Sequence, residues 1–448
     1  MREQTILIIS QLDFLEAGNQ ILLNTCLGFL NKGYKIVFLT SNTEKADNIV
    51  DYNLVFGDYI KNIYFYRFSP VLRPFFRVFK LLYKILLFLK NAFTANNIAD
   101  KLSGDNLKIG IEETVDFVGS KAHFIGFLSW LSFIFGGIGK SLYLLQRYKP
   151  VIVVGYEIYG APVAFMVSKI GKIPLVTKFQ GTVSWHILEK SKFKAWLIIP
   201  HHLLSLKIPA NLIIMENDGT RGKEVLLNLG VEENRIRFWI DGVKKDIYLP
   251  NFNKTEFLKN IGISEDSKIL LTLSRLKIWK RVDRAIWALS KVKEKISNTV
   301  LIVVGDGEVK HSLQSLAEEL GVKDDVIFLG AIPHSEIKNF INGCDIFLSL
   351  YDHSNLCNPI LEALECGKCI VTIDDGTTRE ILKNGYNSML IPKDKLMHQL
   401  PNTIVELLTN NELRKSLENQ ARKCAEENLL SWHDRMKLEV EEIERLLK

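Results

Sequence analysis

Short runs of apolar residues alternate with longer amphipathic stretches along most of the chain. Such runs are typical of buried parallel strands, and the amphipathic stretches are typical of helices that cover a sheet. The first part of the chain has apolar runs at residues 5–10, 35–40, 63–67, 151–155, 175–179 and 212–215. The second part has them at residues 268–274, 299–304, 326–329, 346–350, 369–373 and 388–391. The alternation predicts an α/β protein with two doubly wound parallel sheets.

The stretch at residues 68–95 interrupts this alternation, and it contains no Asp or Glu. Its basic residues Arg73, Arg77, Lys80 and Lys84 are spaced so that they share one helix face, and aromatic and aliphatic residues surround them. A basic stripe beside a wide apolar face is typical of a helix that lies in the interface of an anionic membrane. We therefore predict a membrane-docking region here. The alternative is a buried helix with a solvated basic stripe.

A second unusual stretch, residues 122–139, carries no charged residue. It is slightly shorter than the roughly 20 residues that a membrane-spanning helix needs. Its four glycines, Gly126, Gly136, Gly137 and Gly139, also weaken a helix. We predict a buried or interfacial helix, with a spanning helix as the alternative.

Composition limits the class of protein. A chain of 448 residues with 47% hydrophobic and 24% charged residues is typical of a globular protein with more than one domain. The net charge of +6 is concentrated around residues 59–99, so it predicts a local docking surface and no nucleic-acid partner.

The cysteines and the first residues exclude two further classes. Cys366 and Cys369 have metal-ligand spacing, but no second pair accompanies them, so we interpret them as small core residues and expect no metal site. Residues 1–4 are too short for the first part of a signal peptide, so we expect a cytoplasmic protein.

The most informative stretch is residues 349–374, an apolar strand that runs into a polar loop and then a helix. Free backbone N–H groups at the start of that helix can bind an anionic group. Glu362, about one turn inside the helix, could accept hydrogen bonds from sugar or ribose hydroxyls. The alternative is an ordinary helix start with a core-facing side.

At these residues the chain resembles the retaining glycosyltransferases of family four, whose pattern is E-G-F-G-L-P-x-L-E-A-x-x-x-G-x-P. Here residues 354–363 read SNLCNPILEA, and Gly367 and Cys369 follow. The second Glu of the pattern is kept as Glu362, whereas Ser354 replaces the first Glu, which lies near the donor sugar in the family.

Further motifs support the resemblance in the same order along the chain. Residues 274–280 resemble G-R-L-x-x-x-K-G, with Arg275 and Lys280 in place. Residues 305–307 and 330–334 match later segments, whereas the turn at 241–243 resembles the end of the first domain. The polar segment 248–259 is a predicted linker.

The resemblance implies a GT-B fold, in which two doubly wound, Rossmann-like domains face each other across a cleft and C-terminal helices pack back on the first domain. It implies an acceptor-side domain at residues 1–250, a nucleotide-sugar-binding domain at 251–425 and a returning helix at 426–448. A nucleotide sugar is then the donor substrate, and no metal is required.

The implied site has three groups of residues. The catalytic pair, Arg275 and Lys280, would neutralise the diphosphate as it leaves. The donor-binding residues are Gly18, Gly305, Ala331, Ile332, Ser354, Asn355, Leu356, Cys357, Asn358 and Glu362. The acceptor-side residues, which could instead be ordinary turn residues, are Glu157, Gln180 and Gly181.

The implied function is transfer of a sugar, with retention of configuration, from a nucleoside-diphosphate donor to a membrane-associated acceptor. The acceptor would be a lipid-linked oligosaccharide or a surface-polysaccharide precursor, reached from the inner face of the cell membrane. Two alternatives remain. One is a non-catalytic nucleotide-sugar-binding subunit of a polysaccharide assembly, which the Ser354 replacement favours. The other is a GT-B-fold nucleotide-sugar epimerase, for which Glu157 and Asp352 are the candidate carboxylates.

Overall fold

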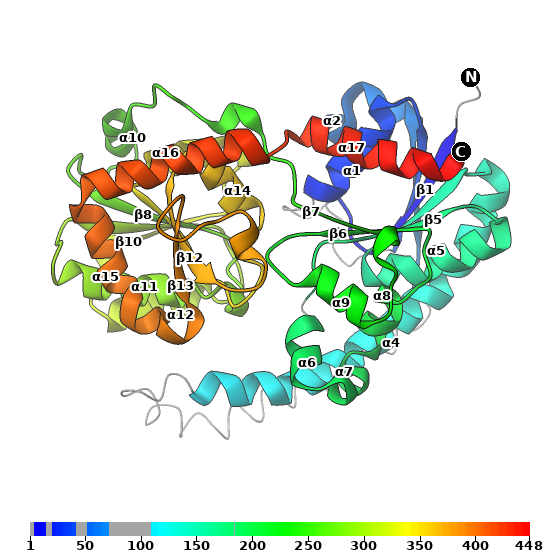
Figure 1. The fold of residues 1–448 in the computed structure, drawn as a ribbon, viewed down its shortest axis with the longest axis horizontal. Helices are drawn as coiled ribbons and strands as arrows, with labels where there is room; N and C mark the ends of the chain where they lie inside the picture. Colours follow the sequence, from blue (N-terminus) through cyan, green and yellow to red (C-terminus); the bar gives the residue numbers. More distant parts are fainter. Residues whose placement is uncertain (1–3, 15–19, 42–51, 71–108, 183) are drawn as a thin grey trace.

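The computed structural model describes residues 4–14, 20–41, 52–70, 109–182 and 184–448, which form two parallel sheets (Figure 1). The first sheet has the strand order β3-β2-β1-β4-β5-β6-β7, and the second has the order β10-β9-β8-β11-β12-β13. In each sheet the direction of winding reverses beside a central strand, at β1/β4 and at β8/β11. Both sheets are therefore doubly wound, as predicted.

The strands of the first sheet are β1 (Thr5–Ser10), β2 (Lys35–Ser41), β3 (Ile63–Phe68), β4 (Ile152–Tyr156), β5 (Leu175–Phe179), β6 (Leu212–Glu216) and β7 (Ile236–Trp239). Those of the second are β8 (Lys268–Leu273), β9 (Thr299–Val304), β10 (Val326–Gly330), β11 (Ile346–Ser349), β12 (Cys369–Asp374) and β13 (Met389–Pro392). Every predicted strand is confirmed, and its ends differ from the prediction by at most one residue. The strand β7 was not predicted.

The helices that pack on the first sheet are α1 (Gln20–Asn31), α2 (Tyr52–Phe56), α4 (Ile109–Tyr148), α5 (Glu157–Gly171), α6 (Ser184–Lys190), α7 (Lys192–Ile198), α8 (Pro200–Leu206), α9 (Gly222–Asn228) and α17 (Trp432–Glu444). Alternate residues of a strand point to opposite faces of the sheet. Accordingly, Ile6 and Ile8 of β1 pack in one core with α1 and α17. Leu7 and Ile9 pack in a second core with α4, α5, α8 and α9.

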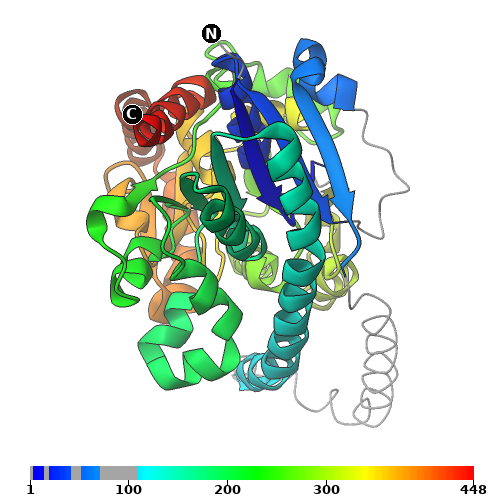
Figure 2. The same cartoon turned by 90° about the vertical axis from the view of Figure 1, so that its right-hand side faces the viewer.

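The uncharged stretch 122–139 lies inside the long helix α4, which runs along one face of the first half (Figure 2). Within the described residues, one helical segment, Ile125–Tyr148, is long and apolar enough to cross a bilayer by length and composition. Phe133 and Leu144 of this segment are buried in the core beneath the first sheet, whereas Phe135 is exposed. The segment therefore covers the sheet on one side and presents its other side to the surroundings.

The second half repeats the layered arrangement with α10 (Lys254–Asn260), α11 (Val282–Lys293), α12 (Lys310–Glu319), α13 (His334–Gly343), α14 (Asn358–Glu365), α15 (Leu396–Thr409) and α16 (Asn411–Asn428). Leu270 and Leu348 pack in one core with α11, α12 and α15. Leu271 and Phe347 pack in the other core with α10, α13, α14 and α16.

The last helices cross from one half to the other (Figure 1). Helix α16 packs on α14 and β12 in the second half, and α17 packs on α1 in the first. At the crossing, the Val243 N–H donates to the Leu430 carbonyl at 3.0 Å. Ser431 caps α17, because its hydroxyl accepts the Asp434 N–H at 3.1 Å. The chain thus passes between the halves at two adjacent points.

A buried ion network holds α17 on the first sheet. Lys178 of β5 donates to Glu439 of α17 at 2.7 Å and to the Thr25 hydroxyl of α1 at 2.9 Å. Arg435 donates to Glu439 at 3.0 Å and to the Ile240 carbonyl at 3.0 Å. Burial alone would raise the pKa of Glu439. The charges of Lys178 and Arg435 nevertheless hold this pKa below its ordinary value.

Three predictions need comment. The predicted linker 248–259 is wrong over its second part, which forms helix α10, because Leu258 is buried in the core of the second half. The membrane-docking prediction for residues 68–95 falls outside the described residues from residue 71 onward. Cys366 and Cys369 are free and buried, so their interpretation as core residues is confirmed.

Candidate active site

The loops at the carboxyl ends of the two sheets meet each other, and the predicted site lies where they meet. The 217–221 loop follows β6 in the first half, and the 351–358 loop follows β11 in the second half. The Leu356 N–H donates to the Asp218 carbonyl at 2.8 Å, and the Ser354 hydroxyl donates to Asp218 Oδ2 at 2.7 Å. A ligand held by the second loop would therefore lie beside residues of the first half.

Lys280 ends the short helix η6 (Ile278–Lys280) and is only 9% exposed. Its ammonium lies 3.7 Å from the ring centroid of Tyr351 and 4.1 Å from that of Trp279. It forms no ion pair among the described residues. Burial lowers the pKa of Lys280 and the nearby charge of Arg275 adds to this effect, whereas Cys357 and Asp218 oppose it. A buried cation without a carboxylate partner is suited to bind an anionic ligand.

The exposed Arg275 lies on a turn that the glycine-rich segment after β9 supports. A Cβ atom on Gly305 would lie 1.8 Å from the Ser274 carbonyl oxygen, and the backbone there has a φ of +131°. The Leu276 N–H donates to the Asp306 carbonyl at 2.9 Å. Gly305 therefore acts on the predicted site by allowing the backbone beneath Arg275 to approach closely.

The side chains of the 351–358 loop point in different directions. The buried Asn355 amide bonds the backbone of Tyr351, at 3.1 Å to the N–H and 2.9 Å to the carbonyl. Leu356 is in the core, whereas Cys357 is half-buried at the start of α14. The Oδ1 atom of Asn358 is buried and has no hydrogen-bond partner among the described residues. Asn355 and Leu356 can thus reach a ligand only through their backbone.

Glu362 forms a second group of site residues with the start of α13. Its Oε1 atom lies 2.7 Å from Nε2 of His334, and Lys244 Nζ lies 3.3 Å from the other ring nitrogen. Ala331 is exposed and Ile332 is half-buried on the segment that leads to His334. This group carries a nearly buried carboxylate that can accept hydrogen bonds from hydroxyl groups of a ligand.

The acceptor-side residues lie together at the carboxyl ends of β4 and β5. Glu157 Oε1 accepts the Gln180 N–H at 2.7 Å, and the Gln180 amide donates to the Tyr156 hydroxyl at 2.8 Å. Glu157 has a φ of +60°, a strained conformation for a residue with a side chain. Burial raises the pKa of Glu157 to about 7, and the nearby Asp218 adds to this.

Asp218 is the site residue that the sequence reasoning missed. Its carboxylate accepts the Thr220 N–H at 3.1 Å, the Thr220 hydroxyl at 2.6 Å and the Ser354 hydroxyl at 2.7 Å. Burial raises the pKa of Asp218, whereas these hydrogen bonds and the charge of Lys280 oppose the rise. The available signal was its position two residues after a strand, which is the same signal that identified Glu157 and Gln180.

Nine of the fifteen predicted site residues form two groups, whereas Arg275, Gly305, Asn355, Cys357 and Asn358 lie on the turn and the loop described above. A first group surrounds Asp218: Glu157, Gln180, Gly181, Lys280, Ser354 and Leu356. A second group surrounds His334: Ala331, Ile332 and Glu362. Gly18 lies outside the described residues. In the part of the chain that the structure describes, no group of three or more His, Cys, Asp or Glu side chains could hold a metal ion.

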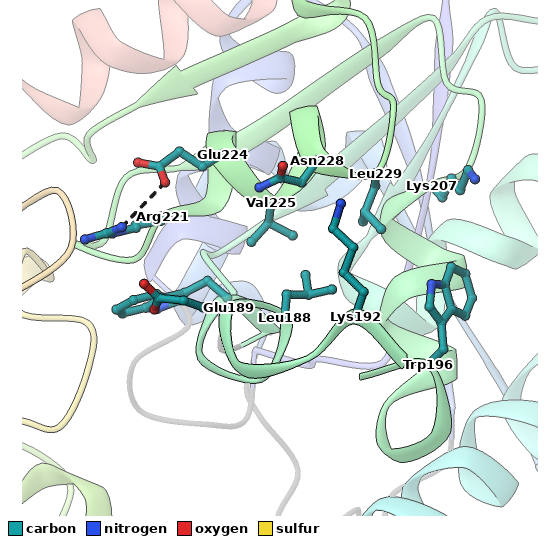
Figure 3. A pocket seen from close by; sticks show the side chains of 11 residues that line it. Leu188, Glu189, Lys192, Trp196, Lys207, Arg221, Glu224, Val225, Asn228 and Leu229 are labelled. Carbon is teal, nitrogen blue, oxygen red and sulfur yellow. Dashed lines mark ion pairs between the residues drawn. The ribbon is translucent and has the colours of Figure 1, made fainter. Parts of the chain in front are cut away.

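A cavity of about 340 Å³ opens in the first half between α6, α7 and α9 (Figure 3). Leu188, Trp196, Val225 and Leu229 give it an apolar lining, and Lys192 extends into it toward Leu229. The following residues supply further charges at its rim: Glu189, Lys207, Arg221 and Glu224. The cavity is therefore suited to a ligand with both apolar and charged parts.

Comparison with known proteins gives a consistent result. Residues 253–424 match the family model of glycosyl transferases group 1. An uncharacterized glycosyltransferase of Methanocaldococcus jannaschii, MJ1069, is 32% identical over 293 residues, which are 60% of this chain and 73% of that protein. A second one from the same organism, MJ1607, is 27% identical over 220 residues, which are 47% of this chain and 54% of that protein. The chain thus spans only about half the length of that second relative.

Several relatives are named for a defined activity, and several similar solved structures have a bound nucleotide. The N,N'-diacetylbacillosaminyl-diphospho-undecaprenol alpha-1,3-N-acetylgalactosaminyltransferase of Campylobacter jejuni is 28% identical over 277 residues, 59% of this chain and 70% of that protein. The crystal structure of HepE from Anabaena in complex with UDP has a TM-score of 0.68 at 14% identity, covering 98% of this chain and 99% of that one. At this identity the likeness concerns the fold, and the predicted GT-B fold is confirmed.

Proposed function

The chain belongs to the glycosyl transferases group 1 family, and we propose that it transfers a sugar from a nucleoside-diphosphate donor to a membrane-associated acceptor. The observation that carries the proposal is Lys280, a nearly buried cation at the meeting point of the loops from both halves. The proposed acceptor is a lipid-linked oligosaccharide or a surface-polysaccharide precursor. The Campylobacter jejuni relative, whose name specifies a diphospho-undecaprenol acceptor, supports this class.

The proposed donor site lies mainly in the second half. Lys280 and Arg275 would neutralise the diphosphate, and the backbone N–H groups at the start of α14 would hold its oxygens. Glu362 would accept hydrogen bonds from the ribose hydroxyl groups. As the sugar–phosphate bond breaks, negative charge grows on the leaving diphosphate, and fixed cations stabilise this charge most strongly in the transition state. We propose that these cations replace a metal ion and that the sugar keeps its anomeric configuration.

The proposed acceptor site lies in the first half, at the ends of β4, β5 and β6. The carboxyl group of Glu157, with a pKa near 7, is suited to take up the proton of an acceptor hydroxyl at neutral pH. Gln180 would accept or donate one further hydrogen bond to that acceptor. The two sites adjoin each other because Asp218 contacts the 351–358 loop.

The proposed membrane contact uses helix α7, which we call the α7 surface. Phe193 is 74% exposed and Leu197 is 66% exposed, and Lys190, Lys192 and Lys194 lie beside them. Apolar side chains next to lysines are suited to the interface of an anionic bilayer. The cavity of Figure 3 opens beside this surface, since Lys192 and Trp196 belong to both. We therefore propose a peripheral position on the cytoplasmic face of the membrane.

The donor site is tested by thermal shift with UDP-, GDP- and other nucleotide sugars. We expect one donor to stabilise the wild-type protein and to lose this effect on Arg275→Ala/Lys280→Ala. That donor is then used in a transfer assay with membrane extract. Absence of stabilisation by every nucleotide sugar would contradict the proposal.

The membrane contact is tested by flotation with vesicles of phosphatidylcholine, alone or with phosphatidylglycerol. Removing two lysines in Lys192→Gln/Lys194→Gln should weaken binding to the anionic vesicles about 30-fold, at about 1 kcal/mol for each lysine. The matched control is Lys291→Gln/Lys295→Gln, which removes two exposed lysines of the second half. Equal binding by both variants would contradict a role of the α7 surface.

A nucleotide-sugar epimerase is the second candidate function, because two carboxyl groups adjoin the turn after β5, that of Glu157 at Gln180 and that of Asp218 at Gly181. The other predicted carboxylate, Asp352, is instead held by Arg284 at 2.6 Å. Incubation with the stabilising donor alone distinguishes the two functions. An epimerase changes the sugar of the donor, whereas a transferase leaves it unchanged until acceptor is added.

A further inference from the structure

The contact between Ser354 and Asp218 places a carboxylate of the first half against the loop that the second half offers to the donor. Ser354 is the position at which the sequence departs from the family pattern. Its hydroxyl donates to Asp218 Oδ2 at 2.7 Å, and it is held at a φ of +65°. That conformation is strained for a residue with a side chain, so the surroundings determine where the hydroxyl points.

The position of Asp218 is tightly constrained on its own side. A Cβ atom on Gly181 would lie 2.3 Å from Asp218 Oδ1, so the absence of a side chain at Gly181 makes room for the carboxylate. Thr220 donates twice to the same oxygen, at 3.1 Å and 2.6 Å. The Asp218 carbonyl also accepts the Leu356 N–H at 2.8 Å.

The hydrogen bonds of this carboxylate leave room for a ligand. An ionised carboxylate offers about four acceptor positions. Oδ1 accepts two hydrogen bonds from Thr220, and Oδ2 accepts one from Ser354. Among the described residues, one acceptor position on Oδ2 therefore remains, and the Ser354 oxygen can still accept a hydrogen bond. No cation forms an ion pair with Asp218 among the described residues, although the charge of Lys280 is near enough to oppose the rise of the Asp218 pKa.

We infer that Asp218 and Ser354 together bind hydroxyl groups of the donor sugar, so that residues from both halves select the sugar. This inference rests on the proposed function. It makes sugar binding depend on contact between the halves, because one member of the pair comes from each. The ligand class is the hexose or related sugar of a nucleoside diphosphate, and Asp218 acts as a specificity-determining residue.

The alternative is that Asp218 only clamps the halves together, and a matched variant separates the two roles. The Asn217 side chain in the same loop donates to Glu380 of the second half at 2.7 Å. Glu380→Gln weakens that clamp without touching Ser354. Asp218→Asn keeps the shape, because its amide oxygen can still accept from Thr220 and its NH2 group can donate to the Ser354 oxygen, but it removes the charge and the acceptor position on Oδ2.

The experiment measures binding of the donor that the wild type selects and of UDP or GDP without the sugar. We expect Asp218→Asn to weaken binding of the nucleotide sugar about 10- to 100-fold, the usual effect of losing a hydrogen bond to a charged group, and to leave the nucleoside diphosphate unchanged. Glu380→Gln should affect both ligands equally and by less than about 3-fold. If Asp218→Asn weakens both ligands equally, or neither, the inference is overturned.

A second variant supplies the carboxylate from residue 354 of the second half in place of residue 218 of the first. Asp218→Ser/Ser354→Asp exchanges the two side chains, and Asp tolerates a positive φ better than most residues. We expect it to recover at least about 10-fold of the sugar affinity that Asp218→Ser loses. Recovery of the melting temperature without recovery of sugar affinity would overturn the inference. Because the readout is binding, an absence of transfer with every acceptor counts against the proposed transferase function alone.

Discussion

Within the described part of the chain, two lysines are almost inaccessible to solvent, and their surroundings differ completely. Lys178, beneath α17, is surrounded by Glu439 at 2.7 Å, Thr25 at 2.9 Å and Glu216 at 3.4 Å. Lys280, at the meeting point of the loops, faces the rings of Tyr351 and Trp279. The first has its charge balanced by the protein, whereas the second forms no ion pair among the described residues.

The difference teaches how a buried charge can be assigned a role. A buried ion pair is costly to break but contributes little net stability, so it is best understood as part of the fold. A buried cation without a carboxylate partner destabilises the protein unless a ligand supplies the balancing negative charge. Such a cation is therefore best understood as part of a binding site. On this reasoning Lys178 belongs to the docking of α17, and we propose that Lys280 belongs to the donor site.

The largest expected effect is on stability at Lys178. Lys178→Met leaves the buried Glu439 without one of its two cations, and we expect a loss of about 3–5 kcal/mol in the free energy of unfolding. Denaturant unfolding measures it. The control Lys291→Met removes an exposed lysine and should change stability by less than about 0.5 kcal/mol. If both variants unfold alike, Lys178 is not part of the fold in the sense proposed.

The next effect is on activity at Lys280. We expect Lys280→Met to lower kcat about 10²- to 10³-fold, as for the loss of one group that stabilises charge in a transition state. The free energy of unfolding should change by less than about 1 kcal/mol, because lost ring contacts and relieved desolvation oppose each other. A stability loss as large as that of Lys178→Met, with transfer intact, would reverse the comparison.

The smallest expected effect is on the pH dependence of stability, and it concerns Glu157. This carboxyl group of the candidate site has a raised pKa, whereas Glu439 of the buried ion network has a lowered one. The pKa of Glu157 is raised from 4.5 to about 7, so the native state keeps this proton over a pH range where the unfolded state has lost it. Stability from this group is therefore fully present below pH 4.5 and is lost as the pH rises to about 7. The greatest slope is about 1.4 kcal/mol per pH unit.

Glu157→Gln tests this dependence. Its free energy of unfolding should fall less steeply than that of the wild type between pH 4.5 and 7. Asp241, whose pKa burial also raises to about 7, titrates in both proteins and cancels in the difference. Parallel curves for the two proteins would show that Glu157 has an ordinary pKa. Its assignment as the group that takes up the acceptor proton would then lose its support.

Much of the fold was predictable because its signals are local. The apolar runs gave the strand ends to within one residue, since buried parallel strands are apolar throughout. Helix α10 was missed because its single fully buried residue, Leu258, lies in a polar segment. A short helix with one core contact leaves almost no periodic signal in the sequence.

The site was predictable only where a motif or a strand end marked it. Arg275, Lys280 and Glu362 were found from motifs within one domain. Asp218 also follows a strand end, but it was missed because no motif marks it and its significance comes from Ser354, which lies 136 residues further along the chain. The balance of charge around Lys178 was equally invisible, because it depends on which distant carboxylates the fold brings close. Pairings of this kind are set by the packing of whole elements.

The pairing of Lys178 with Glu439 has a consequence for synthesis of the protein. The two residues are 261 positions apart. At about 5–20 residues per second, a ribosome needs roughly 13–52 s to add the intervening chain. For most of that interval the strands of the first sheet have been made but lack the helix that balances the buried lysine, while the second half is still being synthesised. We therefore expect the core beneath α17 to be completed only after the second half has been synthesised.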